Sequence, residues 1–162
     1  MNTAEQVLLY LIQESLFGVT TTYPDDVDWN AVFQEAQDQA VFGLINQIQI
    51  KNLFPQWQSK RYQILSNCLQ NLYAQQELIQ LLTEHNIPMA ILKGAASAVY
   101  YPYPFYRTMG DIDVIVPPDY FNAAAKIMEN NGYVKKTFAD EDYERHDEYY
   151  KNGMEIELHH FF

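Results

Sequence analysis

The first half of the chain has its apolar residues three and four positions apart, which is the spacing of an amphipathic helix. Residues that favour helix starts stand ahead of these runs: Thr3 and Gln6 form a capping-box pattern, and Asp28 can cap a second helix. Gly18 and Asn86 lie where the first and the last helix are predicted to end. The pattern therefore predicts an all-helical N-terminal part over residues 1–86, with helices up to Gly18, at about 29–48 and at about 56–85.

After residue 86 the pattern changes to short apolar strands that alternate with helices. Pro117 and Pro118 stop one strand and start a helix, and Asn152-Gly153 is a strong signal for a two-residue hairpin turn. Residues 87–162 are therefore predicted to form an α/β part, which makes the chain an α+β protein. The predicted elements are strands at 88–93, 111–116 and 133–137, helices at 95–100 and 118–131, and a hairpin of 145–151 with 154–160.

Composition and charge narrow the classes of function. The 162 residues suffice for one domain with a sizeable core, or for a small core plus a helical subdomain. A net charge of −11 disfavours a nucleic-acid substrate and an anionic membrane surface. Cys68 is the single cysteine, so no internal disulfide can form, which fits a cytoplasmic protein. No apolar run approaches the roughly 20 residues of a membrane span, and the N-terminus lacks the basic region of a signal peptide.

Two aspartates, Asp111 and Asp113, lie two positions apart in a segment that otherwise predicts a buried strand. Residues i and i+2 of a strand point to the same face, so the two carboxylates are expected side by side. No basic residue lies between them to offset their repulsion, and a divalent cation would do so. The alternative is a solvated polar face at the end of an edge strand, and the motif alone does not choose between the two.

The segment ahead of the aspartates has the pattern of a phosphate-binding turn. An apolar strand ends at Lys93-Gly94 and leads into a helix-compatible segment that contains Ser97. A strand that turns through glycine into a helix presents free backbone N–H groups, which suit a phosphate. Lys93 could contact that phosphate or reach solvent. Arg107 could bind a phosphate or pair with an aspartate, and we favour the phosphate.

The strand after the hairpin turn offers a third carboxylate. Its strict alternation puts Glu155, Glu157 and His159 on one face, and alternation alone does not choose between the two glutamates. Glu155 lies beside the turn, where a strand end is more readily solvated, so Glu157 is the better candidate. His159 could bind a metal or support a ligand, although Mg²⁺ prefers oxygen. His146 is interpreted as a surface residue of the hairpin and His160 as structural.

Together these residues resemble the nucleotidyltransferase superfamily, and most closely the bacterial group of uncharacterised nucleotidyltransferase family proteins. The resemblance covers about residues 87–159 and rests on the Lys-Gly turn, Arg107, Gly-Asp-x-Asp and an acidic residue before Leu-His. It implies a mixed sheet flanked by helices and Mg²⁺ or Mn²⁺ as cofactor, held by Asp111, Asp113 and Glu157. The implied nucleotide-binding residues are Lys93, Gly94, Ser97 and Arg107.

The resemblance also implies the activity. A nucleotidyl group would move from a nucleoside triphosphate to an unknown hydroxyl-type acceptor, on a small molecule or a protein. The alternative is a non-catalytic nucleotide-binding or interaction module that keeps the fold. The superfamily favours Gly-Gly or Gly-Ser at the turn, where this chain has Gly94-Ala95, and aspartate is commoner as the third carboxylate. The chain stops shortly after Glu157, whereas such proteins are usually longer, so a fragment or a minimal form is expected.

Overall fold

The computed structural model describes residues 3–45, 54–136 and 146–160, and it confirms the predicted α+β class. A five-stranded mixed sheet with helices follows an all-helical N-terminal part. Within the described ranges, none of the helices is both long enough and apolar enough to cross a membrane.

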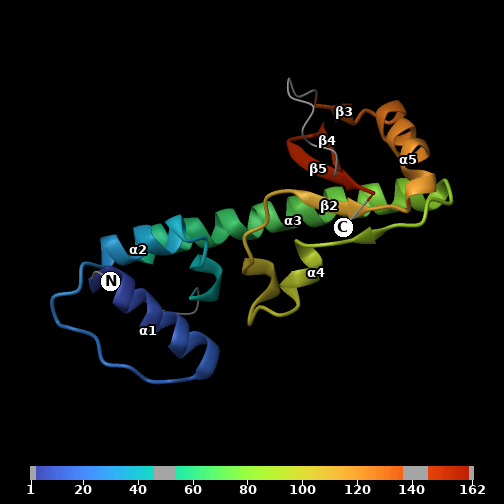
Figure 1. Ribbon diagram of the computed structural model, residues 1–162. Coiled ribbons are helices and arrows are strands. Elements are labelled where there is room, and N and C mark those ends of the chain that lie inside the picture. Colours follow the sequence, from blue (N-terminus) through green and yellow to red (C-terminus); the bar gives the residue numbers. More distant parts are fainter. Residues whose placement is uncertain (1–2, 46–53, 137–145, 161–162) are drawn as a thin grey trace. The chain divides into compact units, whose positions relative to one another are not determined.

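Two compact units make up the chain. The first, which we call the helical unit, comprises residues 1–68 and 98–108; the second, the sheet unit, comprises residues 69–97 and 109–162. The long helix α3 (Phe54–Glu84) contributes its first part to the helical unit and its second part to the sheet unit (Figure 1). The boundary between the two units thus falls within α3, whereas the sequence pattern changes at residue 86. The predicted division into domains at residue 86 stays a prediction.

The helical unit contains α1 (Thr3–Phe17), α2 (Trp29–Asp38) and two 3₁₀ turns, η1 (Phe42–Leu44) and η3 (Pro104–Tyr106). Asp28 caps α2 as predicted, because its carboxylate accepts hydrogen bonds from the N–H groups of Asn30 and Ala31. The helices enclose an apolar core, made of Val7, Leu8, Leu11, Val32, Ala36, Phe42, Ile45, Trp57 and Ile64.

The predicted C-terminal end of the second helix is wrong, because α2 ends at Asp38 rather than near residue 48. Ala40 has a φ of 54°, and the N–H of Val41 donates to the carbonyl of Ala36, which is the Schellman pattern of helix termination. The chain then turns through η1, which brings Phe42 into the core. Residues 46–48 of the predicted helix lie outside the described ranges.

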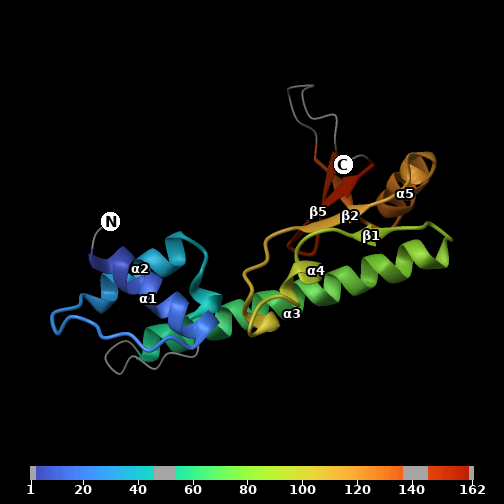
Figure 2. The ribbon, with the colours of Figure 1, turned by 60° about the horizontal axis from the view of Figure 1, so that its bottom comes forward.

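The sheet unit contains a mixed sheet with the strand order β1-β2-β5-β4-β3. β2 and β5 lie side by side (Figure 2) and pair in parallel. Every other neighbouring pair is antiparallel. The strands are β1 (Ala90–Ile91), β2 (Ile112–Ile115), β3 (Val134–Lys135), β4 (His146–Lys151) and β5 (Met154–His159).

The predicted hairpin is confirmed. Asn152 and Gly153 both have positive φ values, 51° and 87°, as a two-residue turn of type I′ requires. The first predicted strand is shorter than expected, since β1 covers only two residues of 88–93. The helix predicted at 95–100 is α4 (Ala95–Ala98), and the helix predicted at 118–131 is α5 (Pro118–Asn130). Residues 137 and 145, included in predicted strands, lie outside the described ranges.

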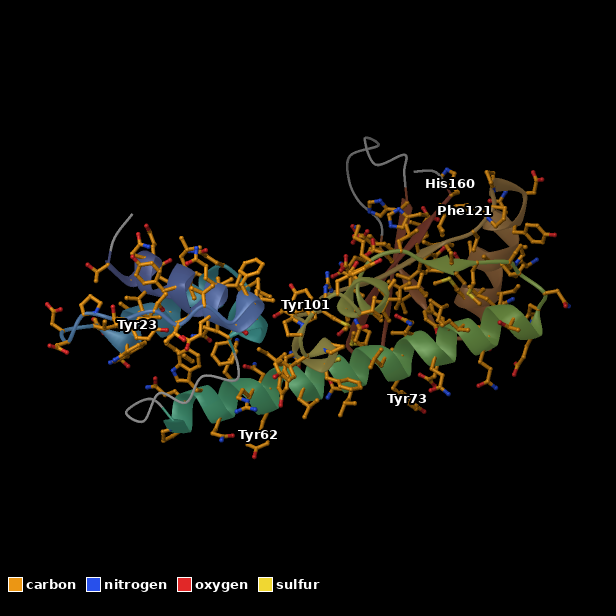
Figure 3. All side chains as sticks on the ribbon, turned by 90° about the horizontal axis from the view of Figure 1, so that it is seen from below. Tyr23, Tyr62, Tyr73, Tyr101, Phe121 and His160 are labelled. Carbon is orange, nitrogen blue, oxygen red and sulfur yellow. The ribbon has the colours of Figure 1, made fainter. Side chains whose placement is uncertain are left out.

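One face of the sheet packs on the second part of α3 and on α5. Alternate residues of β2, β4 and β5 point to this face, and they join helix residues in one core. His160 lies beside Phe121 of α5, with ring centroids 4.3 Å apart, which agrees with the structural role expected for it (Figure 3). The buried core comprises Leu78, Leu82, Ile87, Ile112, Val114, Val116, Ala124, Met128, Tyr133, Tyr149, Ile156 and Leu158.

Candidate functional site

The opposite face of the sheet carries a cluster of three carboxylates. Ile112 and Val114 are buried in the core, so Asp111 and Asp113 point to the other face. The parallel register of β2 and β5 sets Asp113 opposite Glu157. Oxygen atoms of Asp111, Asp113 and Glu157 lie within 4.8 Å of one another, so the structure brings together the three carboxylates that the sequence proposed.

Glu155, the other candidate for the third carboxylate, has a different partner. It lies opposite Tyr150 on β4 and forms an ion pair with Lys136, which also contacts Glu148. The hydrogen bond from Lys136 lowers the pKa of Glu155. Its charge is therefore already offset by a lysine, which supports the choice of Glu157.

Lys93 forms an ion pair that neither interpretation of it included. Its Nζ lies 2.7 Å from Oδ1 of Asp113, and the lysine side chain is 64% exposed while that of Asp113 is 2% exposed. Burial by itself would raise the pKa of Asp113, but the hydrogen bond and charge of Lys93 outweigh burial and lower it. The hydrogen bond to Asp113 in turn raises the pKa of Lys93. A cation therefore does offset part of the repulsion between the aspartates, although it comes from the preceding strand end.

Gly94 forms the turn between β1 and α4. Its φ is 52°, a left-handed conformation that L side chains rarely adopt. A Cβ at this position would lie 3.9 Å from the carbonyl oxygen of Asp111, so the turn lies against the segment that carries the aspartates. The same carbonyl accepts a hydrogen bond from the buried side chain of Asn71 on α3, at 3.4 Å. Ser97 is half-buried within α4.

Arg107 belongs to the helical unit rather than to the sheet unit. Its guanidinium lies 6.0 Å from the ring centroid of Tyr101 and donates a hydrogen bond to the carbonyl of Thr108, at 3.4 Å. Its predicted contact with a phosphate stays a prediction.

Two histidines border the cluster. Nε2 of His159 lies 3.2 Å from Oδ1 of Asp113 and 3.2 Å from Oε2 of Glu157. Nε2 of His146 lies 3.9 Å from Oε1 of Glu157, and its side chain is only 15% exposed, so its interpretation as a surface residue was wrong. The sequence could have placed His146 beside His159. A two-residue turn at 152–153 pairs residue 151 with residue 154, and counting back along both strands pairs His146 with His159.

The cluster has an excess of negative charge that fits a divalent cation. Burial raises the pKa of Glu157, and the charge of Asp111 adds to this effect, against the opposing influence of His146. Within the described ranges, Lys93 is the one lysine or arginine that forms a salt bridge with any of the three carboxylates. Carboxylate oxygens are the ligands that Mg²⁺ and Mn²⁺ prefer, so the residues present fit the implied ion.

Comparison with protein-family models identifies the family of this chain. A family model described as "Uncharacterised nucleotidyltransferase" matches residues 25–161, which includes the turn at Gly94 and all three carboxylates. Searches of curated proteins and of solved structures gave no significant match. Because the family model covers most of the chain, the protein belongs to the uncharacterised nucleotidyltransferase family.

Proposed function

We propose that the protein transfers a nucleotidyl group from a nucleoside triphosphate to a hydroxyl-type acceptor, with Mg²⁺ or Mn²⁺ as cofactor. The observation that supports this most is the convergence of Asp111, Asp113 and Glu157 from two strands that are distant in the sequence. In this reaction the acceptor oxygen forms a bond to the α-phosphorus, and pyrophosphate leaves as the α–β phosphoanhydride bond breaks. The acceptor hydroxyl gives up its proton in the process.

Asp111, Asp113 and Glu157 would hold the cofactor. The bound ion would neutralise charge on the phosphates and favour departure of pyrophosphate. The rigid core behind β2 and β5 fixes the spacing of the carboxylates, so they need no reorganisation when the substrate arrives. No protein nucleophile is required, because positioning and charge neutralisation supply most of the rate.

Lys93 and Gly94 would bind the triphosphate. Lys93 now offsets the charge of Asp113, and its exposed ammonium group would contact a phosphate oxygen when Asp113 is engaged as a ligand of the cofactor. Gly94 would allow close approach of the phosphates to the backbone of the turn. We assign phosphate contacts to Ser97 and Arg107 as well, on the resemblance alone. The acceptor is a small molecule or a protein, since the net charge of −11 disfavours nucleic acid.

Pyrophosphate release tests this proposal. Each of the common nucleoside triphosphates is offered with Mg²⁺ or Mn²⁺ to the wild-type protein, alone and with a panel of hydroxyl-bearing small molecules and proteins. We expect release with at least one pair, and loss of that release in Asp111→Asn and Asp113→Asn, which keep side-chain size but remove charge. Unchanged release in both variants would exclude the proposed site.

One observation favours the alternative of a non-catalytic nucleotide-binding module. The Gly94-Ala95 turn lacks the second glycine or serine that is favoured in the superfamily, which removes a candidate phosphate contact. Thermal melting distinguishes the two functions. A triphosphate that raises the melting temperature with Mg²⁺ but yields no pyrophosphate with any acceptor would support the module.

A further inference from the structure

The polar face of the β4–β5 hairpin brings two imidazole rings together. His146 and His159 lie directly opposite each other in the antiparallel register, with ring centroids 4.9 Å apart and an interplanar angle of 40°. Their side chains are 15% and 13% exposed, so each ring is mostly covered by protein but keeps some contact with solvent. Such an arrangement fixes two nitrogen donors at one place.

Glu157 is the carboxylate that both rings share, while Nε2 of His146 also lies 3.7 Å from Oε1 of Glu148 and Nε2 of His159 lies 3.2 Å from Oδ1 of Asp113. The distances to the Glu157 oxygens are 3.9 Å from His146 and 3.2 Å from His159. One potential ligand atom from each of these three residues lies within 4.8 Å of the other two. Ligands of a tetrahedral site with metal–nitrogen bonds of about 2.0–2.1 Å are roughly 3.3–3.5 Å apart, so only small side-chain shifts would be needed.

The lysines nearby are committed to other carboxylates. Lys93 pairs with Asp113, and Lys136 pairs with Glu148 and Glu155. Among the residues that the structure describes, the salt-bridge partners of Glu157 are the two histidines. The salt-bridge partners of the Glu157 carboxylate are thus side chains of a type that commonly binds metals.

We propose that His146, Glu157 and His159 form a site for a divalent first-row transition cation, for which Zn²⁺ is the probe. Two imidazole nitrogens and a carboxylate suit Zn²⁺ and its neighbours, whereas Mg²⁺ and Ca²⁺ prefer oxygen alone. The site would leave one or more coordination positions for water or a substrate. It lies beside the three-carboxylate cluster and shares Glu157 with it. This metal site does not require that the protein transfers nucleotides.

Two classes of cation would therefore bind on one face of the sheet. Asp111 and Asp113 offer only oxygen and would take the hard ion, while the histidines would take the transition ion. Glu157 belongs to both sets, so its loss should weaken both, whereas loss of an outer ligand should weaken only one. That pattern of selectivity is what distinguishes a built transition-metal site from general attraction of cations to an acidic face.

Isothermal titration calorimetry of the metal-free full chain with Zn²⁺ and, separately, with Mg²⁺ tests the proposal. The variants are His146→Gln, His159→Gln, Glu157→Gln and Asp111→Asn. His85→Gln is the matched control, because His85 is exposed just after α3 and the one contact described for its side chain is with the carbonyl of Leu81. Circular dichroism checks that each variant keeps its fold.

We expect His146→Gln and His159→Gln each to weaken Zn²⁺ binding by more than the roughly 10–100-fold that loss of a ligand's hydrogen-bond partner costs, with Mg²⁺ binding changed less than about threefold. Asp111→Asn should show the reverse, and His85→Gln should change neither. Equal Zn²⁺ affinity in the wild-type protein and both histidine variants would overturn the proposal, as would an equal loss in His85→Gln.

A second measurement needs no variant. Co²⁺ bound by two imidazoles and a carboxylate in a four-coordinate site gives a visible absorption band, which the wild-type protein should develop on titration with Co²⁺. Zn²⁺ should abolish this band. A weak spectrum typical of six-coordinate Co²⁺ with oxygen ligands alone would show that the ion sits among the carboxylates, which contradicts the proposal even if the variants fail to fold.

Discussion

Asp113 is the one buried charged residue in the part of the chain that the structure describes, with 3% of its surface exposed. A buried carboxylate needs a partner, because removing an ion from water costs several kcal/mol. Lys93 supplies that partner from a position that is mostly in solvent. The two partners therefore differ in how much they depend on the ion pair. Water can solvate the ammonium group of Lys93 if the pair breaks, whereas the buried carboxylate of Asp113 would lose its countercharge.

Lys93→Met should destabilise the protein through Asp113. Breaking a buried ion pair costs about 3–5 kcal/mol, and because Lys93 is largely solvated we expect a smaller loss of about 1–2 kcal/mol in the free energy of unfolding. Mg²⁺ should recover more stability in this variant than in the wild-type protein, since the cation replaces the lost charge. Urea denaturation with and without Mg²⁺ measures both effects.

Lys135→Met is the control for this prediction. Lys135 pairs with Asp147 at 2.5 Å, but both side chains are more exposed than the buried carboxylate of Asp113. Its removal should change the free energy of unfolding by less than about 0.5 kcal/mol. Equal losses in the two variants would mean that burial of Asp113 does not set the strength of its pair.

At the scale of elements, three helices end in the same motif. α2, α3 and α5 each place a residue with positive φ after the helix and close it with Schellman hydrogen bonds; these residues are Ala40, Asn86 and Gly132. The sequence predicted helices that end at about residues 85 and 131, next to Asn86 and Gly132, and both residue types favour the left-handed region. It missed Ala40, because alanine is a strong helix former and its strain is imposed by the burial of Phe42 and Ile45.

Ala40→Gly should therefore stabilise the protein. The left-handed conformation costs an alanine about 1–2 kcal/mol, and the greater entropy of glycine in the unfolded chain offsets about 0.5–1 kcal/mol of the gain. We expect a net increase of about 0.5–1 kcal/mol in the free energy of unfolding, measured by denaturant titration. Ala123→Gly on the exposed side of α5 is the control and should cost about 1 kcal/mol. A loss of stability in Ala40→Gly would show that this conformation is not strained.

The turn at Gly94 gives a prediction that separates conformation from binding. Because its φ is positive, a β-branched residue there would be strained whatever it binds, so asparagine is the better substitution. Gly94→Asn should keep stability within about 1 kcal/mol of the wild-type protein. It should also weaken nucleoside triphosphate binding at least about tenfold, or by 1.4 kcal/mol, since a side chain then occupies the approach to the backbone.

Gly132→Asn is the matched control for Gly94→Asn. Gly132 also has a positive φ, 84°, and a Cβ there would meet nothing within 4 Å. It should carry a similar cost in stability with no change in triphosphate binding, measured by calorimetry. Wild-type affinity in Gly94→Asn would remove the phosphate role of the turn.

The candidate site could be predicted only in part. Alternation placed Asp111 beside Asp113, and the hairpin signal placed Glu157 on a polar face, but neither shows that the two strands are neighbours. The parallel pairing of β2 with β5 joins segments more than 40 residues apart. Only the resemblance implied that their carboxylates meet, and it did not give the pairing of the strands. The ion pair of Lys93 was missed for a similar reason, because it depends on the antiparallel pairing of β1 with β2.

At the scale of the whole molecule, the buried apolar residues that the structure describes form two hydrophobic cores, one in each unit, and all three carboxylates of the site lie in the sheet unit. An ion that binds only the folded sheet unit stabilises it by mass action, by about 1.4 kcal/mol at ten times its dissociation constant. The core of the helical unit includes none of these ligands. Cation binding should therefore stabilise the sheet unit more than the helical unit.

Amide hydrogen exchange with and without Mg²⁺ tests this inequality. The amides of Val114 and Leu158, in the two strands that carry the carboxylates, should exchange about tenfold more slowly at ten times the dissociation constant. Those of Leu8 and Leu11, in the core of the helical unit, should change less than about twofold. In Asp113→Asn the slowing should disappear from both strands. Equal slowing of all four amides in the wild-type protein would contradict the prediction, because it would mean that both cores open together and that the sheet unit has no stability of its own for the cation to raise.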